Sequence, residues 1–380
     1  MYYFTGTADE ALAEWERTKD DRLAGRQPRA KDDRAASVAD VVNAFLAFKE
    51  RTKVAPRTFA RYEATGKMLA AFWGRDRTVE SIGPDDFQNL RAKMAERWGA
   101  IALGNEIQIV RSIFVYGFKN ELLTKPARYG DNFQKPTAKA VREARNAKGP
   151  KLFTPEQIKA LLKLASPNLK AMIHLGINAA LGNTDLGLLP VTAIDLAGGW
   201  LDYPRSKTGM PRRIPLWPET VAAVKVAIEK RPEPADPNDA KLLFVAAGGQ
   251  NYIGTHDGCR VGDEFRRLRE AVGDEVAGRS FYDLRRTFQT IADRSLDPVA
   301  IRAIMGHVPA SNDMSAIYRQ SIDDTRLRAV ADGVRHWLFP DEPVKVDAGP
   351  VPKKRPAAKP RVEQHRKPAA DGGPQLRVVG

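Results

Sequence analysis

The chain has 380 residues and a formal net charge of +14 at pH 7, and its single cysteine, Cys259, excludes an intrachain disulfide framework and a cysteine-rich metal site. Its length exceeds that of one typical domain, and its charge is typical of a protein that binds a polyanion, with a basic protein lacking such a partner as the alternative. No run approaches eighteen consecutive apolar residues, so no membrane span is expected.

The amino-terminal part predicts an arm followed by an all-helical domain. Residues 1–36 carry mixed charge and lack the pattern of a secretion signal, which indicates an arm with a short helix in a cytoplasmic protein. From Ser37, a residue type favoured at helix N-caps, apolar residues recur at spacings of three and four. Residues 37–120 therefore predict a helical domain, with helices that begin near Ser37, Pro56, Pro84 and Ala102.

A basic linker is predicted at residues 121–152. Residues 119–151 hold nine Lys or Arg side chains against three acidic ones, and three prolines break any long helix: Pro126, Pro136 and Pro150. The segment is either simply solvated or lies along a phosphate backbone, and its charge bias favours the second interpretation.

The second domain is predicted at residues 153–340. Thr154, Pro155 and Gln157 form a capping-box pattern at its start. Two short apolar segments flank Ser206-Lys207-Thr208-Gly209, which predicts a β-ribbon around a lysine-tipped turn. Helices are expected near 155–165, 168–181, 218–230, 260–272, 281–294, 298–305 and 322–338.

A basic tail is predicted at residues 341–380, since residues 345–380 include nine Lys or Arg and three acids and have no periodic apolar pattern. This composition is typical of a disordered segment that adheres to nucleic acid. Residues 345–380 contribute +6, so the rest of the chain still carries +8, and the basic character does not depend on the tail.

Two segments near the carboxyl terminus suggest phosphate chemistry. One contains Tyr282 and Arg285, and the other runs from Met305-Gly306-His307 to Tyr318. A tyrosine phenol can attack a DNA phosphodiester and store its energy in a covalent bond. Arginine suits the charge that develops on the phosphoryl oxygens because its planar fork donates two hydrogen bonds, and lysine or histidine can protonate the leaving oxygen.

In this order, the residues resemble the tyrosine recombinase (phage integrase) family over roughly residues 37–335. The resemblance depends on the combination of Tyr282-Asp283-Leu284-Arg285, Met305-Gly306-His307, Tyr318 and the lysine hairpin Ser206-Lys207-Thr208-Gly209. It implies a mainly α fold with a small β-sheet: a helical core-binding (SAM-like) N-terminal domain and an α+β catalytic domain that together close on DNA.

The resemblance also implies roles for single residues. Tyr318 matches the nucleophile, Arg285 the second phosphate-binding arginine, His307 the residue that supports the phosphate, and Lys207 the general acid. The implied partner is double-stranded DNA, with a homo-tetramer on DNA and a monomer in its absence. Neither a cofactor nor a metal is implied.

Two departures from the family pattern bear on catalysis. Tyr282 stands where the family usually has a histidine, and a phenol is a poor base at neutral pH. The first arginine of the family falls on Gly182, although Asp185 and Leu186 retain the acid and leucine that follow it. The loss of one preorganised charge donor typically costs roughly 3–4 kcal/mol.

Nearby residues offer partial replacements for the first arginine. Asn183 can donate its amide to a phosphate oxygen, or Asn183 or Thr184 can simply cap the next helix. Arg205 or Arg212 can reach in from the hairpin, and Arg286 is a further predicted DNA contact.

The resemblance therefore implies a site-specific recombinase or integrase that cleaves and rejoins DNA through a 3′-phosphotyrosyl intermediate. The departure at Gly182 leaves open a catalytically impaired relative that only binds DNA. A type IB-like topoisomerase, which shares the chemistry but does not pair two sites, is a third interpretation.

Overall fold

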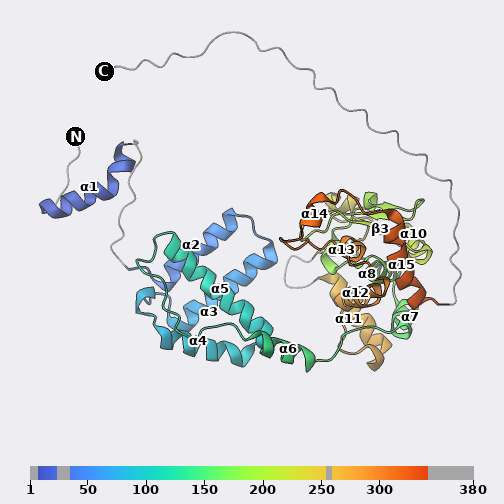
Figure 1. Cartoon of the computed structure of the whole chain (residues 1–380), viewed down its shortest axis with the longest axis horizontal. Coiled ribbons are helices and arrows are strands. Elements are labelled where there is room, and N and C mark those ends of the chain that lie inside the picture. The colour runs from blue at the N-terminus through green and yellow to red at the C-terminus, as the bar shows by residue number, and fades with distance from the viewer. Residues whose placement is uncertain (1–6, 24–34, 254–258, 341–380) are drawn as a thin grey trace, which may run out of the picture. The chain divides into compact units, whose positions relative to one another are not determined.

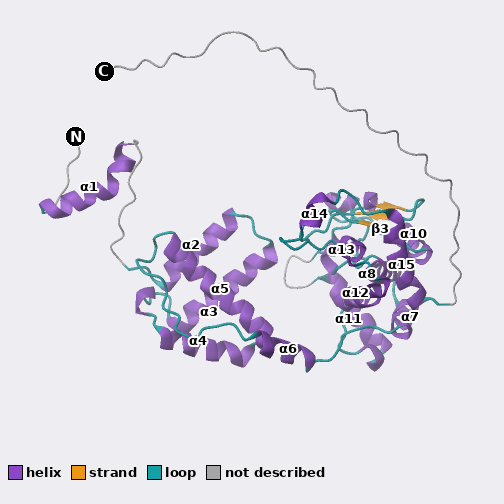
Figure 2. Cartoon of the chain, in the orientation of Figure 1, coloured by secondary structure: helices purple, strands orange, loops and turns teal. Residues whose placement is uncertain are grey.

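The structure, a computed structural model, describes residues 7–23, 35–253 and 259–340. Within these residues the chain is mainly helical with one small antiparallel sheet (Figure 1, Figure 2), which confirms the predicted fold class. The tail predicted at 341–380 lies outside the described residues, as does part of the predicted arm, whose described portion forms α1 (Ala8–Leu23).

The contacts within the chain define two units, and α12 (Tyr282–Ala292) contributes residues to both. The first unit consists of Met1–Gln157 and Tyr252–Thr287, and the second consists of Ile158–Asn251 and Phe288–Gly380.

None of the helices in the described part of the chain is long and apolar enough to cross a membrane.

A helical bundle forms most of the first unit. Its helices are α2 (Val38–Arg51), α3 (Pro56–Trp73), α4 (Pro84–Arg97) and α5 (Ala100–Lys119). The helices begin close to the predicted positions because local signals act there: the Ser37 side chain accepts from the Asp40 N–H, and Pro56 and Pro84 each occupy the first turn of a helix. Helix α5 packs against α2, α3 and α4.

The bundle core is rich in aromatic side chains that meet edge to face. Trp73 and Phe87 have ring centroids 5.1 Å apart, and Phe87 and Phe114 are 5.6 Å apart. Such pairs contribute about 0.5–1.5 kcal/mol each beyond the burial of apolar area. The core also includes Leu123 and Phe133, which lie beyond residue 120, so the packed bundle continues into the segment predicted as a linker.

The segment after the bundle contains a short helix, α6 (Ala138–Asn146), which starts where the Thr137 hydroxyl accepts from the Ala140 N–H. The first unit also includes α11 (Arg260–Val272), as predicted near 260–272. Phe265 of α11 packs edge to face with Phe153 and with Phe281, which joins the start of the predicted second domain to the segment that leads into α12.

The second unit is built on two packed helices, α8 (Pro167–Asn178) and α10 (Pro218–Glu229). Helix α7 (Pro155–Leu164) precedes them and begins at the predicted capping box, because Thr154 and Gln157 exchange hydrogen bonds of 3.1 and 3.3 Å. Helices α13 (Pro298–Met305) and α15 (Asp324–Leu338) follow the predicted ranges, and both pack on β3 (Arg213–Pro215).

The small sheet has the order β1-β2-β3, and both pairings are antiparallel. The predicted ribbon is formed by β2 (Trp200–Asp202) and β3, with Leu201 opposite Ile214. The additional strand β1 (Ile194–Asp195) was not predicted, since two residues carry no readable alternation. The guanidinium groups of Arg213 and Arg328 both contact the Trp200 ring, at 4.0 and 4.5 Å from its centroid, and the second contact links the ribbon to α15.

Candidate functional site

The turn between β2 and β3 presents Lys207 at its tip. The ladder continues past the strands through Tyr203 N–H to Arg212 O (3.1 Å) and Arg205 N–H to Met210 O (2.8 Å). Gly209 then closes the turn with a φ of +69° and donates to Arg205 O at 2.8 Å. The glycine is needed because side chains rarely adopt this backbone conformation. Lys207 is exposed, and its ammonium has no hydrogen bond or ion pair with a described residue.

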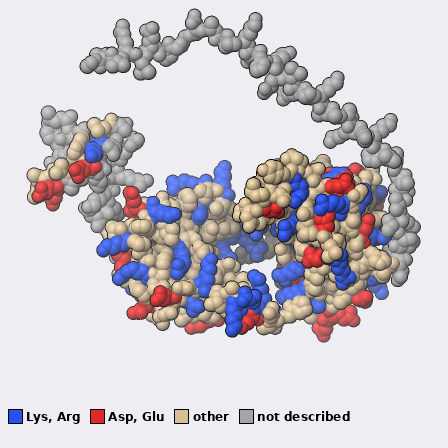
Figure 3. All heavy atoms as spheres, in the orientation of Figure 1, with Lys and Arg blue, Asp and Glu red and all other residues tan. Residues whose placement is uncertain are grey.

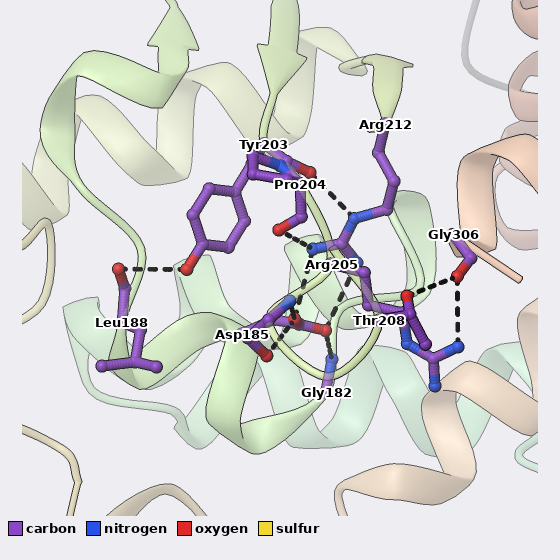
Figure 4. Close-up of polar contacts among 10 residues, drawn as sticks. Gly182, Asp185, Leu188, Tyr203, Pro204, Arg205, Thr208, Arg212 and Gly306 are labelled. Atoms are coloured by element: carbon purple, nitrogen blue, oxygen red, sulfur yellow. Dashed lines mark hydrogen bonds and ion pairs between the residues drawn. The ribbon is translucent and has the colours of Figure 1, made fainter. Parts of the chain in front are cut away.

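Asp185 lies under this turn, in the short helix α9 (Asn183–Gly187) (Figure 4). Its carboxylate accepts from the Ser206 hydroxyl at 2.9 Å and from Arg212 Nη1 at 3.3 Å, and its Oδ1 forms an ion pair with Arg212 Nη2 at 3.2 Å. Burial alone would raise the pKa of Asp185, but the Arg212 charge and the N–H of Gly182 outweigh it and hold the pKa below its ordinary value. Asp185 is therefore an anion at neutral pH, and both of its carboxylate oxygens accept hydrogen bonds.

Arg212 is consequently not presented to solvent, since its side chain is fully buried. Besides Asp185, its guanidinium donates to the carbonyl oxygens of Tyr203 (2.9 Å) and Pro204 (3.4 Å). Arg212 was predicted to reach a phosphate, but in the structure its positive charge is already paired with the carboxylate of Asp185.

The position of the expected first arginine contains no side chain. Gly182 is the N-cap of α9, and its N–H donates to Asp185 Oδ2 at 3.2 Å. Of the capping roles considered for Asn183 and Thr184, neither is realised, because the N-cap is Gly182 and Asn183 is already the first helical residue. The side-chain oxygen of Asn183 is buried and has no hydrogen-bond partner among the residues that the structure describes.

His307 follows the C-cap of α13, and this second turn meets the Lys207 turn. Gly306 has a φ of +62°, as expected for a glycine that ends a helix, and the His307 N–H donates to Arg302 O at 2.9 Å. The Gly306 carbonyl accepts from Arg205 Nη1 at 3.3 Å and from the Thr208 hydroxyl at 3.2 Å. Lys207 and His307 are therefore carried by two turns that are in direct contact.

Gly306 also has a steric reason to lack a side chain. A Cβ atom at this position would lie 2.9 Å from Arg205 Cβ and 2.9 Å from Arg212 Cδ. The close approach of the two turns therefore depends on glycine, in addition to its positive φ.

Tyr318 is the last residue of α14 (Met314–Tyr318), a short helix whose N-cap is Asp313. A cavity of about 600 Å³ lies beside α14 and is also lined by Arg212 and His307. Tyr318 does not line this cavity; it is 76% exposed, and its hydroxyl has no hydrogen bond with a described residue. The phenol is thus accessible to a macromolecular ligand.

The remaining predicted site residues lie at the start of α12, in the first unit. Arg285 is buried with 3% exposure, and Leu284 and Phe288 of the same helix are fully buried. Tyr282 is exposed, and Arg286 lies over its ring, with a guanidinium carbon 5.5 Å from the centroid. Arg286 also donates to Asp283 at 2.6 Å.

The sequence patterns gave Ser206 and Thr208 no role other than membership in the matching motifs. Asp185 was recognised only as a retained acid. Their part in holding the hairpin depends on partners far away in sequence, such as Gly306 for Thr208, 98 residues apart. The glycine before His307 was the one local signal, because it predicted a tight turn.

Solved structures of integrases share this fold. The Tn1549 transposon integrase (residues 82–397), in complex with circular intermediate DNA, is 17% identical, with a TM-score of 0.56 over 77% of this chain and 98% of that chain. A lambda integrase dimer bound to a COC′ core site is 14% identical, with a TM-score of 0.57 over 84% of this chain and 91% of that chain. A lambda integrase tetramer bound to a Holliday junction is 14% identical, with a TM-score of 0.56 over 84% of this chain and 92% of that chain.

These structural neighbours are tyrosine recombinases, so the chain has the fold of that class of protein. No protein-family model matches the sequence, and no curated protein sequence matches it. At this level of identity, the likeness establishes the fold, and the chemistry has to be argued from the site.

Proposed function

We propose that this chain is a DNA strand transferase of the tyrosine recombinase type, which cleaves and rejoins DNA as a site-specific recombinase or integrase. The main support is the contact between the Lys207 turn and the His307 turn at Gly306, next to the helix that ends in the exposed Tyr318. The fold shared with integrases supports the same proposal independently of these contacts.

In the proposed reaction the Tyr318 hydroxyl loses its proton to solvent water and its oxygen attacks the phosphorus of one DNA strand. A 3′-phosphotyrosyl bond forms, the bond to the 5′-oxygen breaks, and Lys207 supplies the proton that converts this oxygen to a hydroxyl. Arg285 and His307 donate to the non-bridging oxygens, and Tyr282 contributes a further hydroxyl. Attack by a 5′-hydroxyl on the phosphotyrosine reverses these steps and rejoins a strand.

The cleavage rate is expected to be low. Gly182 offers no guanidinium, and the charge of Arg212 is neutralised by Asp185. The same observation favours a second candidate function, a relative that binds DNA without cutting it. Arg205 is half-buried and bonds the Gly306 carbonyl through Nη1, which leaves its other nitrogens for a phosphate oxygen in either case.

Double-stranded DNA is the proposed partner of both units. Figure 3 shows Lys and Arg over much of the visible face of the α2–α5 bundle, with most of the acidic side chains at its lower edge. Exposed basic residues of the bundle include Arg51, Lys53, Arg57, Lys67, Arg75 and Arg97. We propose a homo-tetramer on DNA, a monomer in its absence and a cytoplasmic, DNA-associated location.

A trapping experiment tests the proposal. A preferred site is first enriched from a pool of random duplexes, and a nicked version of that site is then prepared so that the cleaved strand diffuses away. The wild-type chain is expected to form a covalent protein–DNA adduct, and Tyr318→Phe, which removes one oxygen atom, is expected to form none.

The same experiment separates the alternatives. Salt-sensitive binding without any adduct would identify the non-cutting relative. Adduct formation together with relaxation of a plasmid that lacks the preferred site would indicate a topoisomerase. The absence of binding to duplex DNA at moderate salt would contradict both proposed functions.

A further inference from the structure

The residues on both sides of Lys207 are anchored to different parts of the second unit. Before it, Ser206 donates to Asp185 Oδ1 from its hydroxyl at 2.9 Å and from its N–H at 3.3 Å. After it, the Thr208 hydroxyl donates to the Gly306 carbonyl at 3.2 Å. Arg205 Nη1 reaches the same carbonyl at 3.3 Å (Figure 4).

Both anchors are themselves held firmly. Asp185 lies in α9, is only 5% exposed and is paired with the fully buried Arg212 side chain. The Gly306 carbonyl belongs to the C-cap of α13, where φ is +62° and where an added Cβ atom would lie only 2.9 Å from the side chains of Arg205 and Arg212, so the two turns are closely packed. A buried ion pair and a packed helix end move little on the time scale of side-chain rotation.

Lys207 itself takes no part in these bonds, and its ammonium has no partner among the described residues. With residues 206 and 208 bonded to fixed groups, the backbone at Lys207 is held, and only the lysine side chain is left to rotate. A catalytic group confined in this way reacts faster because less orientational freedom is lost in the transition state.

We propose that Asp185, acting through Ser206, and the Gly306 carbonyl, acting through Thr208 and Arg205, position Lys207 to protonate the leaving 5′-oxygen. These residues are positioning residues and transfer no proton themselves. The inference rests on the proposed strand-transfer function, and it also explains the use of Arg212: its charge stabilises the anchor at Asp185 rather than a phosphate.

The test uses a substrate for which the general acid is dispensable. When the bridging 5′-oxygen of the scissile phosphate is replaced by sulfur, a thiolate leaves without a proton, because thiols ionise near pH ~8.5 whereas alcohols do so only at far higher pH. Single-turnover cleavage by the full-length chain is measured on oxygen-bridged and sulfur-bridged DNA of the same sequence.

Two variants each remove one of the hydrogen bonds that anchor the Lys207 turn. Ser206→Ala removes the hydroxyl bond to Asp185, and Thr208→Val removes the hydroxyl bond to the Gly306 carbonyl. Each is expected to cleave the oxygen-bridged DNA roughly tenfold more slowly than the wild type and the sulfur-bridged DNA at nearly the wild-type rate. Lys207→Ala should show the same selectivity with a larger loss. Thr192→Val, which removes an exposed hydroxyl of the same unit that bonds no described residue, should cleave both DNAs at the wild-type rate.

Each other outcome has a definite meaning, provided that circular dichroism shows the variants folded. An equal loss of cleavage rate on both substrates would mean that the bonds of Ser206 and Thr208 are merely structural. No loss of rate on either substrate would mean that these bonds do not affect cleavage. Both results overturn the inference and leave the strand-transfer function intact. A wild-type chain that forms an adduct with neither DNA would overturn the proposed function and this inference together.

Discussion

Restoring an arginine at position 182 is the most direct test of how the site works. The structure tolerates the change locally: Gly182 has an ordinary φ of −94°, and a Cβ atom there would meet only Asp185 Oδ2, at 3.8 Å. The backbone N–H to Asp185 that caps α9 is retained in Gly182→Arg. Loss of a glycine N-cap without a capping side chain costs about 0.5–1 kcal/mol, so the variant should fold.

The expected gain in rate is much larger than the expected loss in stability. One preorganised donor to the transition-state phosphate contributes roughly 3–4 kcal/mol, or about 10²–10³ in rate. Single-turnover adduct formation on the nicked duplex should therefore increase by up to that factor. Gly182→Gln is the matched control, because it adds a long polar side chain without the charge.

The comparison between these two variants decides the question. If Gly182→Arg folds and binds DNA but forms adduct no faster than Gly182→Gln, the idea that a missing guanidinium limits this site would be refuted. If the wild-type chain already cleaves rapidly and neither variant is faster, another group supplies the charge, and Arg205 is the first candidate for substitution.

Three further predictions concern stability and can be checked by urea unfolding. Asp185→Asn leaves the buried Arg212 charge without its partner and should lower the free energy of unfolding by about 3–5 kcal/mol, whereas a change within 1 kcal/mol would contradict the ion pair. Gly306→Ala places a Cβ atom 2.9 Å from two neighbours at a φ of +62° and should cost at least ~1–3 kcal/mol; full stability would argue against contact between the turns. Burial lowers the pKa of His174 to about 4, so its neutral form favours the folded state; stability is complete above pH ~6.5 and is lost as the pH falls from there toward 4. At pH 5 the loss from this histidine should reach about 2 kcal/mol, and His174→Gln, compared at pH 7.5 and 5, should lose correspondingly less on acidification.

The sequence alone determined the elements whose signals are local. Ser37, Pro56 and Pro84 marked helix starts in the bundle because capping and proline geometry act within a single turn. Gly209 marked the predicted hairpin turn for the same reason, since its backbone conformation is a property of the residue itself. The order of Lys207, Arg285, His307 and Tyr318 was enough to suggest the recombinase fold, which the structural neighbours share.

Only the tertiary structure decided how the hairpin is held and which charges are available. Asp185 and Arg212 are 27 residues apart, and their pairing arises from the way in which α9 and the β2–β3 ribbon pack. Until the partners of Arg212 were known, it was an equal candidate with Arg205 for a DNA contact. Hydrogen bonds and ion pairs between distant segments depend on the packing of the whole unit, so a pattern of neighbouring residues does not encode them.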